Sequence, residues 1–221
     1  MGRVKRMVNI FLSPTEVFEE LKEKSDWLIP LLLILIVSLL LSYFILDVTI
    51  PTMIEEVHAN PDLSAMEREQ QIAYLESPIM YVSSVIGGFL GNIIIYLILA
   101  GVFVLISFVF GGEKIAFKNI FSGAVYVGLI GILASIFAGL ITYSTGELST
   151  GLTLGLFLPA SGYLERLIGG ISIFGIWQVI LYSLMLMVFY NYSKKKAFSI
   201  MFALYGGMVF ILSLFYFIPG F

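Results

Sequence analysis

Polar side chains that could bind a solute occur at only a few places in this chain. Asn92 and Tyr96 lie one helical turn apart in one apolar run, and Gln178 and Tyr182 have the same spacing in another. An amide among apolar groups needs a hydrogen-bond partner, so we expect the two pairs to face each other inside a helix bundle. They are candidates for contacting a solute, with simple packing as the other interpretation.

A second set of residues could bind a metal. Glu55 and His58 are one turn apart, and Glu67 and Glu69 could add ligands. However, His58 is the single histidine and the chain has no cysteine, which excludes thiolate sites and any site that needs two histidines. We therefore favour a solvated acidic face here and expect no metal, no other cofactor and no enzyme activity.

The composition decides what kind of element carries these residues. Of the 221 residues, 59% are hydrophobic and 12% are charged, against about 45–50% and about 25% in soluble domains. Too little charge is available to cover a soluble surface, so the chain is expected to be an integral membrane protein. The net charge of −3 gives no reason to expect a nucleic-acid partner.

Five apolar runs are long enough to cross a bilayer, which takes about 20 residues. The sequence predicts an all-α polytopic membrane protein with five transmembrane helices in one bundle, formed by residues 26–221. The spans are expected at about 27–46, 82–109, 119–143, 167–190 and 197–217. The run 152–159 is too short to cross and predicts an interfacial or re-entrant segment. Because no ionisable residue falls in the middle of a span, ion-coupled transport is disfavoured.

The basic residues predict the orientation. Only Arg68 and Arg166 follow the first or third span; the other ten of the 12 fall before the first span, between the second and third, or between the fourth and fifth. Lysine and arginine resist translocation, so the side rich in them is expected to be cytoplasmic. The N-terminus is then inside, and the C-terminus, after five crossings, is outside.

Residues 1–25 form an arm before the first span. Apolar residues recur there at the spacing of one helical face: Val4, Met7, Val8, Phe11 and Leu12. Arg3, Lys5 and Arg6 flank this face, which predicts an amphipathic interfacial helix lying flat on an anionic leaflet. Next, 13–16 reads Ser-Pro-Thr-Glu, which predicts a capping box and a second helix to about Glu23. The arm either steadies the first span or recruits a cytosolic partner.

Two further patterns concern the connections and the packing. The segment 47–78 predicts an acidic outer loop, in which the capping box Ser64-Ala65-Met66-Glu67 begins a helix over 65–75. Small residues recur at four-residue spacing inside the spans, which predicts close helix packing or a contact between two copies. These small residues are Gly87 and Gly91, then Gly131, Ser135 and Gly139, then Ser199, Ala203 and Gly207.

Four short motifs follow one another along the chain. They are Ser13-Pro14-Thr15-Glu16-Val17-Phe18, then Asp26-Trp27-Leu28-Ile29-Pro30, then Gly111-Gly112 with Phe117-Lys118, Phe121 and Tyr126, and last Lys195-Lys196-Ala197. Their order resembles the Yip1 family of membrane proteins, in its prokaryotic branch. The usual Tyr-Gly before the proline is Leu-Ile here. The Gly-Tyr and proline common in the third span are replaced by Ala124-Val125-Tyr126 and Gly128.

The resemblance implies five membrane helices with a cytoplasmic N-terminus, in the cytoplasmic membrane of a prokaryote. Eukaryotic relatives act in vesicle traffic with small prenylated GTPases of the Rab type, a role that we do not transfer. From the residues themselves, Asp26 one turn before Pro30 favours the positive end of a helix, and Trp27 suits headgroup depth. We therefore interpret Asp26, Trp27 and Pro30 as an anchor, and we count Tyr126 among the polar intramembrane candidates.

Two functions remain open at this point. The leading hypothesis is a non-enzymatic membrane scaffold or adaptor that acts in membrane organisation or trafficking-like processes. Its partners would be the lipid bilayer and, through the arm, a second copy or another membrane or cytosolic protein. The alternative is a passive channel or carrier for a small solute or lipid, which the four polar residues at matched depth would line.

Overall fold

The computed structural model describes residues 1–145, 151–158 and 161–217. Within these ranges the secondary structure is helical, apart from an isolated bridge between Thr153 and Ser172. Five helices are long and apolar enough to cross a membrane: α3 (Leu28–Ala59), α5 (Pro78–Phe110), α6 (Phe117–Thr145), α8 (Ile173–Tyr190) and α9 (Lys194–Ser213). The predicted all-α polytopic membrane fold is confirmed.

The remaining elements are short. The arm forms α1 (Arg3–Leu12) and α2 (Pro14–Glu23), and α4 (Ala65–Leu75) lies between the first two long helices. Between α6 and α8 the structure has a 3-10 turn, Leu154–Leu156, and helix α7 (Tyr163–Gly169). A last 3-10 turn, Leu214–Phe217, follows α9.

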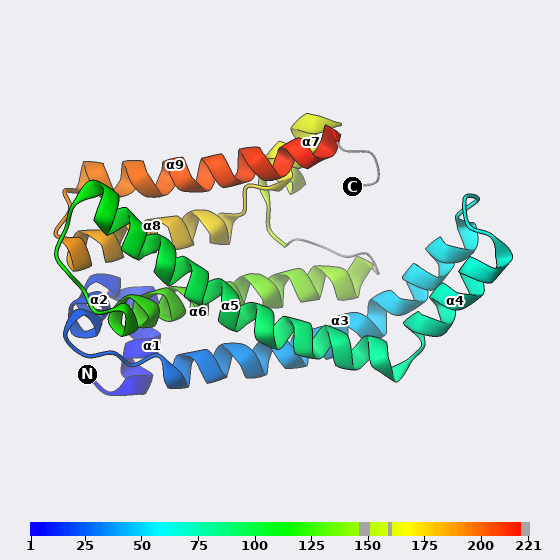
Figure 1. The fold of residues 1–221 in the computed structure, drawn as a ribbon, viewed down its shortest axis with the longest axis horizontal. Helices are drawn as coiled ribbons and strands as arrows, with labels where there is room; N and C mark the ends of the chain where they lie inside the picture. The colour runs from blue at the N-terminus through cyan, green and yellow to red at the C-terminus, as the bar shows by residue number, and fades with distance from the viewer. Residues whose placement is uncertain (146–150, 159–160, 218–221) are drawn as a thin grey trace.

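The segment 47–78 is mostly helical, which corrects the predicted outer loop. Helix α3 continues through Pro51 to Ala59 over 32 residues, or about 48 Å, well beyond the roughly 30 Å of a hydrocarbon core. With α4 it forms a helical hairpin that projects from the bundle (Figure 1). The capping box that begins α4 is confirmed, because Glu67 N donates to Ser64 Oγ at 3.3 Å and Ser64 N to Glu67 Oε2 at 2.8 Å.

Two other boundaries differ from the sequence-based expectation. The fourth long helix begins at Ile173 rather than near 167, because α7 stops at the pair Gly169-Gly170 and Ser172 caps a new helix. The capping box predicted at Ser13 is absent. Ser13 joins α1 directly to α2 and its N–H is bonded to Asn9 O at 2.7 Å, so the residue ends one helix and begins the next.

The bundle has two different ends. At one, which we call the arm end, lie α1 and α2, the connection 111–116 and the connection 191–193 (Figure 1). At the other, the hairpin end, lie the α3–α4 hairpin and α7. The ten basic residues that the sequence groups on one side all fall at the arm end, and Arg68 and Arg166 fall at the hairpin end.

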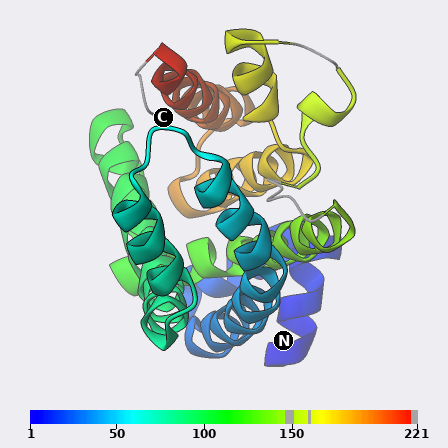
Figure 2. The same ribbon diagram turned by 90° about the vertical axis from the view of Figure 1, so that its right-hand side faces the viewer.

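Helix α6 is the centre of the bundle. It packs against α3, α5, α8 and both arm helices, and residues 119–130 are buried without interruption. Helix α9 packs mainly on α8 and is peripheral, as the view from the hairpin end shows (Figure 2). Large apolar side chains elsewhere point outward, with Phe108 85% exposed. This distribution suits a lipid environment, in which apolar groups need no cover.

The glycines of α6 allow its neighbours to approach closely. A Cβ at Gly128 would overlap the Tyr96 hydroxyl, and one at Gly131 would lie 3.4 Å from Gln178 Nε2. The small-residue stripe of α6 is therefore used for packing, in part. The expectation of packing is wrong within one chain for Gly87, Gly91 and Gly207, because a Cβ at each of them would meet no atom of another helix within 4 Å.

The close approach of Tyr96 to Gly128 can be tested with two matched glycine substitutions. Gly128→Ala places a methyl group against Tyr96 and should lower the free energy of unfolding by about 1–3 kcal/mol through overpacking. Gly87→Ala should leave it unchanged or raise it by up to about 1 kcal/mol, because alanine is the better helix former and the space is open. Thermal and denaturant unfolding in detergent measures both. Equal effects would contradict the close packing of α5 on α6.

Candidate functional site

Buried charges gather where the arm meets the first turns of α3 and α6. Arg6 Nη1 donates to Asp26 Oδ2 at 2.6 Å, and Tyr126 donates its hydroxyl to the same oxygen at 3.3 Å. Arg3 Nε donates to Asp26 Oδ1 at 3.1 Å. The Asp26 backbone N–H donates to Ser122 Oγ at 3.1 Å. Asp26 thus joins α1 to α6 immediately before α3 begins.

A second carboxylate holds the other side of the arginine. Arg6 Nε and Nη2 both donate to Glu20 Oε2, at 2.9 and 2.7 Å, so the guanidinium lies between α2 and Asp26. The side chains of Arg6 and Asp26 are only 9% and 10% exposed. Burying such charges is costly, but leaving either one without its partner costs more. The cluster therefore fixes the arm to one place on the bundle.

The charged partners shift the ionisation of this cluster. Burial alone would lower the pKa of Arg6, but the hydrogen bonds to Glu20 and Tyr126 outweigh it and raise that pKa. The amino group of Met1 and, after it, Arg6 lower the pKa of Glu20, although partial burial opposes them. A lowered carboxyl pKa stabilises the fold above the unfolded-state pKa, and this contribution is lost as the pH falls through the folded-state value. Both groups are charged near neutral pH.

The end of α2 is tied to three other elements. Asn119 Nδ2 of α6 donates to Lys22 O at 2.6 Å, and Lys22 Nζ donates to Val188 O of α8 at 3.0 Å. The same Nζ lies 2.7 Å from Glu113 Oε2 in the connection 111–116. Phe18 of α2 packs edge-on against Phe189, with ring centroids 6.2 Å apart. The arm is consequently part of the bundle and not only a helix lying beside it.

A second junction at the arm end joins α5 to the turn between α8 and α9. Tyr190 and Tyr192 donate their hydroxyls to Phe103 O and Ile106 O, at 3.0 and 3.3 Å, and Lys196 Nζ donates to Phe110 O at 2.7 Å. A Cβ at Gly112 would lie 2.9 Å from Tyr190 Cβ. The motifs Gly111-Gly112 and Lys195-Lys196-Ala197, far apart in sequence, therefore meet in space.

The residues interpreted as an anchor do lie together. Asp26 is held as described, Trp27 packs edge-on against Phe121 with centroids 5.5 Å apart, and Pro30 is buried in the first turn of α3. Proline suits that position because the first N–H groups of a helix have no partner inside it. Tyr126 is part of the same cluster through Asp26. These four residues bring the second and third motifs of the sequence into contact.

The other intramembrane candidates occupy packed positions in the bundle. Asn92 Nδ2 donates to Gly88 O of its own helix at 2.8 Å, so the expectation that it reaches across the bundle is wrong for this group. Tyr96 fits against Gly128, and Gln178 lies against Gly131. Tyr182 packs on Phe103, with ring centroids 5.0 Å apart.

The two junctions place the sequence motifs in contact, and a family comparison covers the same stretch of chain. A family model described as the Yip1 domain matches residues 8–217. The chain belongs to the Yip1 family. No curated protein and no solved structure matches it. The Yip1 domain of this chain thus includes most of the arm and all five long helices.

The contacts that attach the arm to the bundle can be called the arm junction. The sequence analysis did not predict the internal contacts of five of its residues, namely Arg6, Glu20, Lys22, Asn119 and Ser122. Arg3 and Arg6 were expected to flank a face turned to lipid headgroups, yet both are paired with carboxylates of the chain. The apolar side of α1 is also divided. Ile10 is fully buried, whereas Val4, Val8 and Leu12 are exposed. The sequence did carry one signal of this pairing. Acidic residues recur at helical spacing in α2, namely Glu16, Glu19, Glu20 and Glu23, and they could have partnered a basic residue of α1.

The cluster predicts different outcomes for two neighbouring arginines. Arg6→Gln leaves Asp26 without its main counter-charge in a buried position and should lower the free energy of unfolding by about 3 kcal/mol. Arg3→Gln should change it by less than about 1 kcal/mol, because the Arg3 side chain is 67% exposed. Denaturant unfolding measures the difference, and hydrogen exchange of residues 3–24 locates it. Equal losses in the two variants would contradict the assigned role of Arg6.

Proposed function

We propose that this Yip1 domain is a non-enzymatic membrane scaffold or adaptor whose arm presents a fixed surface to a partner. The observation that carries the proposal is that the arm has one buried side and one exposed side. Its inner side is fully buried against the bundle through Ile10, Val17, Phe18 and Leu21. Its outer side on α2 remains exposed and carries Glu16, Glu19 and Glu23. A helix attached by these contacts holds its exposed charges in a defined position on the bundle.

The polar groups of the arm junction support a structural role for that cluster. Asp26 accepts hydrogen bonds from Arg3, Arg6 and Tyr126. The other nitrogens of Arg6 donate mainly to Glu20. Groups that satisfy one another are not poised to bind a substrate or to exchange a proton with one. The cluster is better suited to holding the arm than to chemistry.

The channel or carrier alternative has weaker support. Asn92 is bonded to the backbone of its own helix, Tyr96 and Gln178 are packed against glycines of α6, and Tyr182 is packed on Phe103. Liposome flux through the wild-type protein that Asn92→Leu abolishes would nevertheless favour transport and contradict the scaffold.

The proposal includes an orientation. We place the arm end in the cytoplasm and the C-terminus outside, because ten of the 12 basic residues lie at the arm end. Val4, Val8 and Leu12 of α1 would then rest at the boundary between headgroups and acyl chains. The assignment to the prokaryotic branch and to a cytoplasmic membrane remains a prediction that accompanies this orientation.

The absence of cysteine makes the orientation directly measurable. Single variants Lys195→Cys at the arm end and Glu69→Cys at the hairpin end are exposed labelling positions. In intact cells a membrane-impermeant maleimide should label Glu69→Cys at once, and Lys195→Cys only after permeabilisation. The reverse pattern would place the arm outside and remove the basis for a cytosolic partner.

The scaffold itself is tested on the outer face of α2. Deleting the arm would also uncover apolar surface of α6 and α8, so substitutions are the cleaner choice. Glu16→Gln, Glu19→Gln and Glu23→Gln together should weaken the association of the native partner about tenfold or more, as measured by quantitative co-purification and cross-linking. Glu55→Gln with Glu69→Gln is the control on the hairpin. Unchanged partners in the triple variant would contradict the role of this face.

A further inference from the structure

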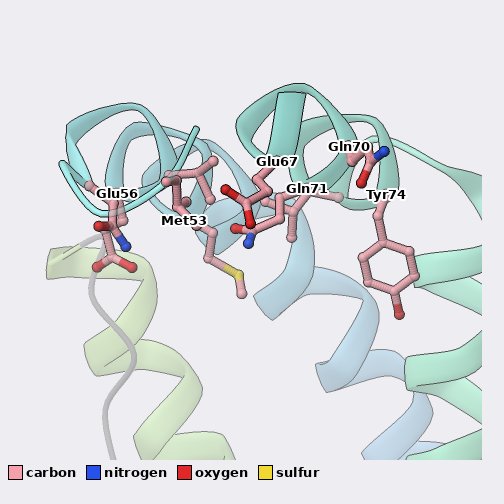
Figure 3. Close-up of a pocket in the computed structure, with 10 residues that line it drawn as sticks. Met53, Glu56, Glu67, Gln70, Gln71 and Tyr74 are labelled. Carbon is pink, nitrogen blue, oxygen red and sulfur yellow. The ribbon is translucent and has the colours of Figure 1, made fainter. Parts of the chain in front are cut away.

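A cavity lies outside the bundle, between the last turns of α3 and helix α4. Its volume is about 560 Å³, which is within the range of small-molecule sites. The apolar part of the lining consists of Met53, Val57, Leu63 and Leu75. The polar lining consists of Glu56, Asn60, Glu67, Gln70, Gln71 and Tyr74. Figure 3 shows Glu67 and Gln71 side by side on α4, with the Met53 thioether near them.

The lining carries acidic groups but no basic one. Glu56 contributes a carboxylate from α3 and Glu67 one from α4, and none of the lining residues is basic. Arg68, the basic residue nearest in sequence, donates Nη2 to Asn60 O at 2.7 Å and lines a neighbouring cavity with His58 and Glu69. Hydrogen bonds from the side chain and backbone of Ser64 lower the pKa of Glu67, which therefore stays ionised. A carboxylate has about four lone-pair sites, so one that accepts these two bonds can still accept others.

The lining selects a class of ligand. Two carboxylates and the amide oxygens can accept hydrogen bonds from a cation, and Tyr74 lines the same cavity. The apolar residues of the lining would contact an aliphatic stem. A metal ion fits less well, because the described part of the chain groups no three histidine, aspartate or glutamate ligands.

We propose that this cavity binds an ammonium group carried on an aliphatic stem. Met53 lies about 38 Å along α3 from Leu28, beyond a hydrocarbon core of about 30 Å. The cavity is therefore in the aqueous or headgroup layer, where such a group is found on a free polyamine or on an ethanolamine headgroup. The site is independent of the arm and of the scaffold role.

The test uses the full chain in phosphatidylcholine nanodiscs, with spermidine as the probe in titration calorimetry. Spermidine should bind saturably to wild type, and Glu56→Gln with Glu67→Gln should raise the Kd about tenfold or more. Glutamine also serves in a capping box, so α4 should stay folded, as thermal unfolding will show. The matched control is Glu55→Gln with Glu69→Gln, which removes the same charge from the hairpin outside the cavity and should raise the Kd less than about threefold.

Further experiments identify where the bound ammonium group comes from and define the results that would overturn the proposal. Phosphatidylethanolamine in the nanodisc should weaken spermidine binding if the headgroup occupies the site, and should leave it unchanged if the ligand is a free amine. Equal weakening by the two double variants would overturn the site in favour of a diffuse acidic field. No saturable binding in either lipid would also overturn it. Tighter binding of tetralysine, lost in Glu56→Gln with Glu67→Gln, would overturn it in favour of a partner's basic segment.

Discussion

The arm end depends on one buried guanidinium. Arg6 is held between Glu20 and Asp26 at the edge of an apolar bundle, where an unpaired charge would be far more costly than in water. Each carboxylate comes from a different segment, so the ion pairs can form only when α1, α2 and the start of α3 are all in place. Tyr126 and Ser122 extend the same constraint to α6. An amphipathic arm that could have rested on lipid in many positions is thereby given one.

Inside the bundle, the comparable constraint is space rather than charge. In lipid no hydrophobic force drives helices together, so close contact requires small residues or hydrogen bonds. Gly123 and Gly128 are the small residues, and they allow Met185 and Tyr96 to approach the backbone of α6. The hydrogen bonds are those from Tyr190, Tyr192 and Lys196 to carbonyl groups of α5. Helix α6 can then contact five other helices, which explains why residues 119–130 are buried throughout.

The sequence predicts this fold well wherever a single residue pattern decides the outcome. The length and hydropathy of five runs predicted five long helices, and the Ser64–Glu67 box predicted α4 to the residue. Prediction from the sequence fails where the structure of one segment depends on a second segment. Ser13 must end α1 as well as begin α2, and the pair Gly169-Gly170 divides an apolar run that reads as one. For the candidate site, Asp26, Trp27, Pro30 and Tyr126 carried a signal in their motifs. Arg6 did not, because basic residues beside an apolar face are also what lipid headgroups attract.

The two ends of the molecule are consequently held in different ways. At the arm end, ion pairs and hydrogen bonds join segments up to 166 residues apart, as from Lys22 to Val188. At the hairpin end, α3 and α4 pack around Ile50, Leu75 and Met80, a small apolar cluster separate from the main core. A region with its own small core can open without disturbing the bundle, because local stability follows local buried contacts. Tight attachment suits a surface that must present fixed charges, and looser attachment suits a cavity that must admit a ligand. The difference in packing thus supports placing the partner surface at one end and the ligand site at the other.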